Sequence, residues 1–176
     1  MRIKRLSSTP RAIAALSDIL IEVVANGGSV SFMHPLAPDA AAAFWTRSLA
    51  AADAGERVVL GAVIDGELAG TVTLDLDCPP NQPHRAEIAK LMTRLRHRGR
   101  AVARTLMLAA ERIAAGEGRT LLTLDTAEEG GAAGLYAGLG YQYVGTIPDY
   151  ALKPLGGLTG TRIYFKRIGA AAAPMR

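Results

Sequence analysis

The hydrophobic pattern of residues 58–76 restricts the fold more than any other stretch of the chain. Residues 58–64 form a short apolar run, and residues 68–76 form a second one. Between the two runs stand Asp65 and Gly66, the residue pair favoured in two-residue turns of β-hairpins. This pattern predicts two buried strands that run antiparallel to each other.

The region that follows predicts a parallel pair of strands. Residues 86–93 and 121–126 are apolar runs of strand length, and apolar residues at helical spacing predict a helix over 100–115. A helix that crosses between two strands of one sheet usually leaves them parallel. Together with the hairpin, this unit predicts a mixed sheet of the α/β (α+β) class.

The remaining segments extend this sheet and cover it with helices. The chain has no internal repeat and no linker, so we expect a single domain over 1–168 and a frayed tail over 169–176. All segments together predict a mixed, mostly antiparallel sheet of about six or seven strands with about four helices. The further strands are expected at 3–6, 141–146 and 162–166, the last two joined by a loop rich in Gly and Pro, and the further helices at 10–25, 39–53 and 131–139.

The composition argues against several classes of protein. Cys78 is the only cysteine, so no internal disulfide can form, and a reducing cytoplasm is the simplest setting. Asp18 and Glu22 interrupt the apolar run near the start of the chain, which argues against a signal peptide, and no apolar run is long enough for a membrane span. The net charge of +4 fits an anionic ligand, whereas 5% aromatic residues argue against a nucleic-acid-binding surface. The three histidines share no metal-ligand spacing, so we expect no metal.

A strand meets a helix at the sequence RHRGRAVA, where arginines lie among small residues. The first amides of a helix have no intrahelical acceptors and lie at the positive end of the helix dipole, so such a junction binds anions, commonly phosphate. Gly99 and Ala103 would let a phosphate approach the backbone, and Arg98, Arg100 and Arg104 would add charged donors. The alternative is a solvated helix start whose small residues serve helix packing. The stretch has neither the GK[ST] of a P-loop nor a G-x-G-x-x-G fingerprint.

The longer stretch LMTRLRHRGRAVARTLM resembles the cofactor-binding segment of the GNAT acetyltransferase superfamily, which reads Gln or Arg, two residues, Gly, one residue, then Gly or Ala. Arg98 matches the first position of that pattern, Ala103 matches the last, and Thr93 ends the preceding strand. Ala101 stands where the pattern has glycine. Because alanine fits helical φ/ψ, we expect its amide still to donate. The resemblance implies that acetyl-CoA is bound by Leu91, Met92, Thr93, Arg98, Gly99, Arg100, Ala101, Val102, Ala103 and Arg104.

A second segment, LLTLDTAEEGGAAGLYAGLGYQYVG, is similar to the strand, helix and strand that come next in the same family. Tyr136 in LYAGLGY matches the tyrosine that the family places near the coenzyme sulfur, and Glu129 stands where the family often has asparagine. The outer parts NGGSVSFM, NQPHRAEIAKLM and RIYFK are similar to the toxin- and antibiotic-resistance branch, in particular to the tabtoxin-resistance acetyltransferase type. The family resemblance, which covers residues 57–147, also implies that the parallel pair is splayed at the centre of the sheet.

The resemblance implies transfer of an acetyl group from acetyl-CoA to a primary amine of a small molecule, such as an antibiotic or toxin. The amine must lose a proton before it attacks, and a carboxylate can accept that proton directly or through a water. Glu87, on an otherwise apolar strand, and Asp125, at the end of the next strand, are the two candidates. The structural alternatives are an ion pair of Glu87 with Arg85 or Lys90, and a turn or helix cap at Asp125.

The resemblance also implies roles for residues around the reacting carbonyl. A backbone N–H near Leu91 or Met92 would stabilise the oxyanion, and Tyr136 would protonate the thiolate, unless its ring serves only core packing. The alternatives to a small-molecule enzyme are a protein or peptide N-acetyltransferase and a non-catalytic acyl-CoA-binding sensor. We expect a cytoplasmic monomer or homodimer. The acceptor pocket is expected to include Phe32, Tyr150 and Tyr164.

Overall fold

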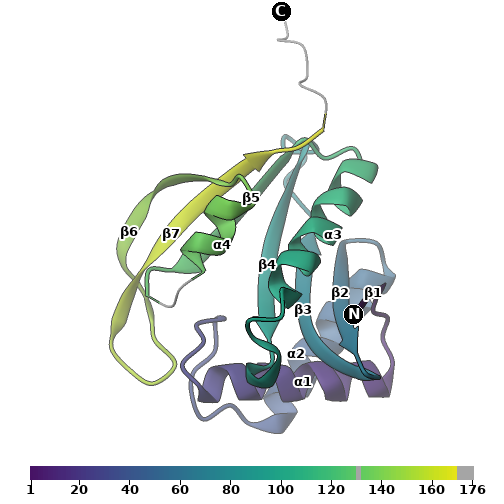
Figure 1. Ribbon diagram of the computed structural model, residues 1–176, viewed down its shortest axis with the longest axis vertical. Coiled ribbons are helices and arrows are strands. Elements are labelled where there is room, and N and C mark those ends of the chain that lie inside the picture. Colours follow the sequence, from purple (N-terminus) through teal and green to yellow (C-terminus); the bar gives the residue numbers. More distant parts are fainter. Residues whose placement is uncertain (130–131, 170–176) are drawn as a thin grey trace, which may run out of the picture.

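The computed structural model describes residues 1–129 and 132–169, which form one seven-stranded sheet with four α-helices (Figure 1). The strand order across the sheet is β1-β2-β3-β4-β5-β7-β6, which confirms the predicted mixed sheet with flanking helices. Residues 170–176 of the predicted tail and residue 131 of the last predicted helix lie outside the described residues. The strands are β1 (Arg2–Arg5), β2 (Arg57–Ile64), β3 (Glu67–Asp75), β4 (Arg85–Thr93), β5 (Leu121–Ala127), β6 (Gln142–Leu152) and β7 (Leu158–Arg167). The helices are α1 (Pro10–Ala25), α2 (Pro38–Asp53), α3 (Val102–Gly116) and α4 (Ala133–Gly138), with a short 3-10 helix η1 (Leu95–His97).

β4 and β5 are the one parallel pair in the described sheet, and every other neighbouring pair is antiparallel. The parallel register joins residues 85–87 of β4 to residues 121–123 of β5 and ends there. Both strands continue, to Thr93 and Ala127, so they separate and open a V at the centre of the sheet (Figure 1). The splayed parallel pair that we expected is therefore confirmed.

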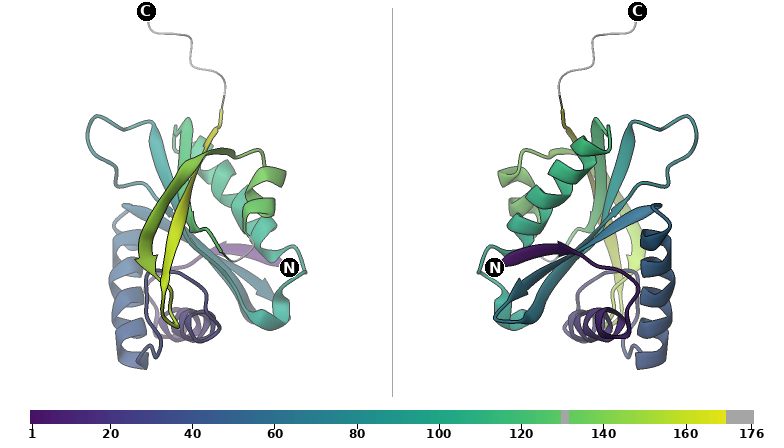
Figure 2. Two further views of the ribbon diagram at one scale, coloured as in Figure 1. Left: turned by 90° about the vertical axis from the view of Figure 1, so that its left-hand side faces the viewer. Right: turned by 90° about the vertical axis from the view of Figure 1, so that its right-hand side faces the viewer.

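Helices cover both faces of the sheet, and each face has its own apolar core (Figure 2). On the face with α3 and α4, Leu106 of α3 is completely buried, and on the face with α1 and α2, Trp45 of α2 is completely buried. β4 contributes to both cores, through Ile88 on one face and Met92 on the other. This strand is therefore held firmly from both sides. No helix in the described ranges is long and apolar enough to cross a membrane.

The end of β4 is irregular, and a glycine on the neighbouring strand permits the irregularity. Lys90 has a positive φ of 51°, and the register between β3 and β4 shifts between Thr71 and Thr73. This bulge re-aims the last residues of β4. A Cβ on Gly70 of β3 would lie 2.6 Å from the carbonyl oxygen of Met92, so a larger residue there would push the two strands apart.

The last two strands run further than the sequence pattern predicts. β6 extends to Leu152 and β7 begins at Leu158, whereas the pattern predicts a loop rich in Gly and Pro between 146 and 162. Pro148 falls inside β6, where a proline usually ends a strand. β6 tolerates this proline because it lies at the edge of the sheet and its register with β7 shifts at the same place.

Candidate active site

The V between β4 and β5 opens into a cleft with two connected parts. The first part, the inner cavity, has a volume of about 230 Å³, and the second, the outer groove, a volume of about 480 Å³. Leu91, Thr126 and Tyr136 line both parts, so the two meet beyond the end of the parallel pairing. The inner cavity is further lined by residues 29–31, 88–90, 150–152 and 159–161 and by Asp125, and the outer groove by residues 26–30 and 92–93, Arg98, Ala103, Glu129 and Leu135.

The outer groove reaches the start of α3, where the chain forms a junction suited to an anion. The amides of Val102, Ala103 and Arg104 are the first of the helix and have no intrahelical acceptor. Arg98 and Ala103 line the groove beside them. The amide of Arg98 donates to the carbonyl oxygen of Leu95 at 3.1 Å, so that amide is not available to a ligand. The junction therefore offers free helix amides beside a guanidinium, an arrangement that fits a phosphate-bearing ligand.

Ala101 does not have the helical conformation that we expected from the sequence. Its φ of 58° and ψ of 17° are left-handed, and α3 begins one residue later, at Val102. Gly99 also has a positive φ, of 72°. A left-handed backbone costs a residue with a Cβ about 1–2 kcal/mol. Glycine, which the family pattern has at this position, adopts a left-handed backbone without cost, whereas Ala101 adopts it under strain.

Three other residues predicted to bind the coenzyme direct their side chains elsewhere. Arg100 places Nη1 3.1 Å from Nδ1 of His97, and Arg104 donates from Nη1 to the carbonyl oxygen of Gly138 at 3.1 Å. Val102 is buried in the core under α3. These contacts help to hold the loop and α4 in place, and the coenzyme-binding role of the three residues stays a prediction.

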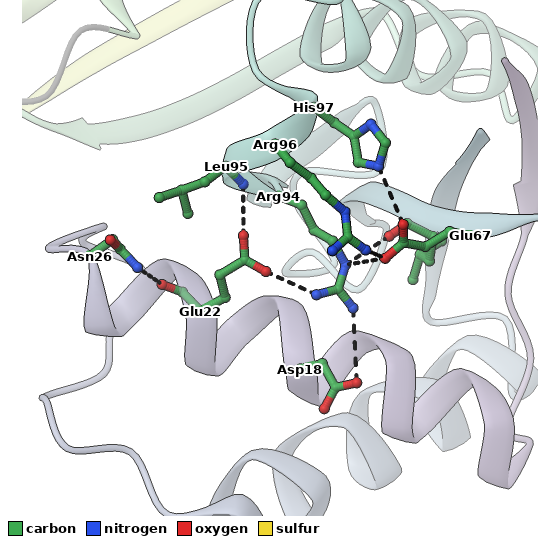
Figure 3. A network of polar contacts seen from close by, with 9 residues as sticks. Asp18, Glu22, Asn26, Glu67, Arg94, Leu95, Arg96 and His97 are labelled. Atoms are coloured by element: carbon green, nitrogen blue, oxygen red, sulfur yellow. Dashed lines mark hydrogen bonds and ion pairs between the residues drawn. The ribbon is translucent and has the colours of Figure 1, made fainter. Parts of the chain in front are cut away.

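Ion pairs with α1 fix the loop between β4 and α3 (Figure 3). The side chain of Arg94 is 12% exposed; its Nη1 lies 2.9 Å from Oε2 of Glu22, and its Nε donates to the carbonyl oxygen of Leu68 at 3.1 Å. The other oxygen of Glu22 accepts the amide of Leu95 at 2.7 Å. Asp18, also on α1, lies 3.9 Å from Arg94 and is 68% exposed. One carboxylate, that of Glu22, therefore fixes both the side chain and the backbone of the loop.

Glu67, at the start of β3, gathers the other charged residues of this loop (Figure 3). Its carboxylate contacts the guanidinium groups of Arg94 and Arg96 and lies 3.5 Å from Nε2 of His97. Burial and the adjacent arginines lower the pKa of His97, so the ring is neutral at neutral pH. Sequence reasoning missed this network, because its members come from α1, β3 and the loop and each alone resembles an ordinary surface charge.

Tyr136 lies where the inner cavity and the outer groove meet. It is buried on α4, and its ring centroid lies 5.9 Å from that of Tyr141 and 5.5 Å from that of Tyr164. Burial and the neighbouring Asp125 carboxylate raise the pKa of Tyr136 to about 12. The phenol therefore stays protonated at neutral pH and can donate to a group in the cleft.

The two candidate carboxylates have different surroundings. Asp125 lines the inner cavity, and its Oδ2 accepts a hydrogen bond from Oγ1 of Thr161 at 2.9 Å. Glu87 does not line the cavity, and its Oε2 lies 3.2 Å from Nη1 of Arg85. The structure thus brings Asp125 and Tyr136 together. Glu87 forms the ion pair with Arg85 that we gave above as an alternative to a catalytic role.

Lys90 is a cavity residue that sequence reasoning named only as a possible ion-pair partner. It lines the inner cavity, and its Nζ lies 3.1 Å from Oγ of Ser31 and 5.8 Å from the ring centroid of Phe44. Burial lowers the pKa of Lys90, and Asp125 and Glu87 oppose that change. The bulge at Lys90 leaves no mark on the apolar pattern of the strand. The family resemblance implies a bulge in this strand but does not say which side chain it turns into the cavity.

The three aromatic residues predicted for the acceptor pocket lie in three different places. Tyr150 lines the inner cavity from β6. Phe32 packs edge-on against Phe44 in the core under α1 and α2, with ring centroids 5.2 Å apart. Tyr164 is buried in the opposite core beside Tyr136. Of these three, Tyr150 alone lines the cavity.

The outer groove carries a negatively charged residue as well as Arg98. Glu129, which stands where the family often has asparagine, lines the groove, and its Oε2 lies 3.2 Å from Nζ of Lys153. Met92 and Thr93 line the groove from β4. In the part of the chain that the structure describes, no three His, Cys, Asp or Glu residues are grouped to hold a metal ion. Lys153 offsets the charge of Glu129, so the groove does not repel an anionic ligand as strongly as its sequence suggests.

Comparison with known proteins places this cleft in a family. The chain matches the model of the Acetyltransferase (GNAT) family over residues 28–141. It is similar in fold to a ribosomal-protein-alanine N-acetyltransferase from Brucella melitensis, at 19% identity and a TM-score of 0.81, with 96% of this chain and 100% of that chain covered. It is also similar to a proposed acetyltransferase from Salmonella typhimurium with its cofactor acetyl-CoA, at 16% identity and a TM-score of 0.78, with 98% of each chain covered.

A third solved structure, an aminoglycoside 6'-N-acetyltransferase complexed with coenzyme A, is 18% identical, with 98% of this chain and 100% of that chain covered and a TM-score of 0.76. The family match runs from the loop after α1 to the residue before β6 and so includes the β4–α3 junction, Asp125 and Tyr136. It covers more than half of the chain. The protein therefore belongs to the acetyltransferase (GNAT) family, as an N-acetyltransferase that uses acetyl-CoA.

Proposed function

We propose that the protein acetylates a primary amine of a small molecule by direct attack in a ternary complex. The observation that carries the proposal is that Asp125 and Tyr136 line one cavity of about 230 Å³, which joins the outer groove at Leu91. A cavity of this size suits a small amine. The sequence resemblance to the toxin- and antibiotic-resistance branch supports an antibiotic or toxin as the acceptor, and we propose the cytoplasm as the setting.

We assign the handling of the amine to Asp125. A primary amine carries a proton at neutral pH, and its nitrogen can attack only after that proton leaves. The Asp125 carboxylate attracts the ammonium and accepts the proton directly or through a water, while the hydroxyl of Thr161 holds the carboxylate in place. We assign Glu87, which is paired with Arg85, to support of the strand.

β4 and Tyr136 act on the two ends of the thioester that acetyl-CoA supplies when bound. As the nitrogen–carbon bond forms, the carbonyl oxygen gains negative charge, which an amide of Leu91 or Met92 stabilises beyond the last pair of β4 with β5. As the carbon–sulfur bond breaks, the Tyr136 hydroxyl gives its proton to the thiolate. Two protons leave the nitrogen in all: the one that Asp125 takes from the ammonium passes on to solvent, and the one lost as the amide forms replaces the proton that Tyr136 gave to the thiolate.

A thiol-release assay with acetyl-CoA held constant tests the proposal on a panel of small amines and of peptides with free N-termini. Turnover of small amines and no turnover of peptides would support it. Turnover of peptides alone would assign the protein to peptide acetylation instead. Coenzyme binding without turnover of either class would identify an acyl-CoA sensor.

Asp125→Asn and Glu87→Gln form a matched pair, because each removes one charge and keeps the shape. We expect Asp125→Asn to lower kcat/KM by about 10²–10⁴-fold, the usual loss for a general base. We expect Glu87→Gln to lower the melting temperature, because it breaks the pair with Arg85, and to keep the rate per folded molecule. Melting temperature and initial rate measured on the same samples decide between them, and a fully active Asp125→Asn would contradict the assignment of the base.

A further inference from the structure

The wall of the inner cavity carries one positively charged and one negatively charged side chain. Lys90 and Asp125 are the two charged residues that line it. Within residues 1–129 and 132–169, neither side chain forms a salt bridge, and each instead contacts a hydroxyl group, Oγ of Ser31 at 3.1 Å or Oγ1 of Thr161 at 2.9 Å. A cavity with one free cation and one free anion complements a ligand that carries both charges.

Lys90 is held at its place in the wall by the backbone. It forms the bulge of β4 directly before Leu91, and its ammonium contacts Ser31 in the loop after α1. The ring of Phe44 lies near Nζ as well. Burial lowers the pKa of Lys90, because the surrounding groups displace water from the ammonium. A negatively charged ligand group beside Nζ would compensate for that lost hydration.

Asp125 reaches the same cavity from β5, near Tyr136. Its carboxylate is close enough to that phenol to raise the pKa of Tyr136. An ammonium held by Asp125 is therefore next to the point where the inner cavity meets the outer groove. An anionic group held by Lys90 lies toward the loop of Ser31. The positions of the two charges therefore set the orientation in which an acceptor binds.

We propose that the acceptor is a small amino-acid-like zwitterion, whose reacting amine binds Asp125 and whose carboxylate binds Lys90 and Ser31. This inference rests on the proposed function, because it names the substrate class of the same site. It also disfavours polycationic amines such as aminoglycosides and polyamines, because a second ammonium would lie beside Lys90.

The test compares amino acids with their carboxamides, which keep the amine and the shape but lose the negative charge. The panel contains glycine, alanine and 4-aminobutyrate, each beside its amide, together with one aminoglycoside and one polyamine. Thiol release gives kcat/KM for each compound. Because hydrogen bonds to charged groups are the strong ones, we expect the acids to exceed their amides by about tenfold or more.

Three variants locate the effect at Lys90. Lys90→Met should bring the acid-to-amide ratio of kcat/KM to about one, whereas Lys90→Arg keeps the charge and should keep most of the preference. Lys4→Met is the matched control, because Lys4 is an exposed lysine on β1 that does not line the cleft. Melting temperature and coenzyme affinity show that each variant is folded.

The outcomes separate the inference from the function on which it rests. A wild-type ratio near one, a preference for the aminoglycoside or the polyamine, or a folded Lys90→Met that keeps the wild-type ratio would overturn the inference and leave the proposed function standing. No turnover of any amine by a protein that binds the coenzyme would overturn the proposed function, and the inference with it. A ratio that falls in Lys90→Met and not in Lys4→Met supports both.

Discussion

The outer groove and the inner cavity meet at Tyr136, but the chain builds them in different ways. One wall of the groove comes from residues within a single stretch, 91–103, and its anion site combines backbone amides of the helix start with the Arg98 guanidinium. The cavity is assembled from the loop after α1, β4, β5 and the β6–β7 hairpin, and its charges belong to side chains. Part-buried ion pairs of Arg94 support the loop beside the groove, whereas hydroxyl groups contact the charged side chains of the cavity.

This difference separates two tasks. In our proposal the groove binds a coenzyme that does not change from one reaction to the next, and a backbone site held by a network of ion pairs suits that purpose. The cavity is the part that we propose to select the acceptor, and we expect single side chains on its walls to tolerate replacement without a shift of the sheet. We therefore expect substitutions in the two parts to affect different constants, coenzyme affinity in one and acceptor preference in the other.

The largest effect should come from Tyr136, where the two parts meet. Tyr136→Phe removes the hydroxyl that we propose as the proton donor to the thiolate, and loss of a general acid typically lowers kcat by about 10²–10⁴-fold. Coenzyme affinity should hardly change. Because the pKa of Tyr136 is raised to about 12, its protonated form persists below that pH, so Tyr136 should cause no alkaline decline of kcat in the usual assay range.

Tyr143→Phe is the control for that experiment, since Tyr143 is 54% exposed on β6 and lines neither part of the cleft. It should keep the wild-type kcat. A Tyr136→Phe variant with the same kcat as the wild type would assign Tyr136 to packing against its aromatic neighbours.

The second largest effect should come from Glu22, which supports the groove and not the cavity. Glu22→Gln keeps the size of the side chain but removes the charge that pairs with Arg94 and accepts the Leu95 amide. Hydrogen bonds to charged groups contribute about 1.5–3 kcal/mol. We therefore expect a lower melting temperature and coenzyme affinity weaker by about tenfold, with the acceptor KM retained, as measured by calorimetry and steady-state kinetics.

Asp18→Asn is the control for Glu22→Gln. Asp18 also lies near Arg94, at 3.9 Å, but its side chain is 68% exposed. Exposed pairs of this kind contribute little, so it should leave both measurements unchanged. If Glu22→Gln bound the coenzyme as tightly as the wild type, the network would not be a support of the groove.

The smallest effect should come from Ala101. Ala101→Gly relieves about 1–2 kcal/mol of left-handed strain and adds about 0.4–1 kcal/mol of entropy to the unfolded chain, so the free energy of unfolding should rise by about 1 kcal/mol or less. Ala43→Gly, at an exposed position inside α2, should lower it by about 1 kcal/mol instead. Urea denaturation measures both, and a destabilised Ala101→Gly would contradict the account of the strain.

Local patterns predicted most of the fold. The turn at Asp65-Gly66 and the helix between β4 and β5 were readable, because each depends on neighbouring residues. The full length of β6 was not readable. Pro148 signals a break unless the strand lies at an edge, and edge position is a property of the strand order across the whole sheet.

The same division applies to the site. Arg98, Ala103 and Tyr136 could be placed in the cleft because they belong to short motifs, although their roles stay predictions. Lys90 could not be placed, because the bulge that puts it in the cavity depends on how closely β3 approaches β4 at Gly70. The conformation of Ala101 depends on where α3 begins, and helix ends are poorly defined by sequence.

The short pairing of β4 with β5 has a mechanical consequence. In the described part of the chain, three residue pairs form the parallel pairing, and the amides of Thr120 and Leu121 donate to the carbonyl oxygen of His84 beside it. Beyond Glu87 and Thr123, the facing N–H and C=O groups need water or a ligand as partners. A molecule that forms hydrogen bonds to both strands would take the place of the missing strand pairing. Its binding free energy adds to the stability of the folded protein, so we expect the two halves of the sheet to separate less readily in the loaded enzyme than in the empty one.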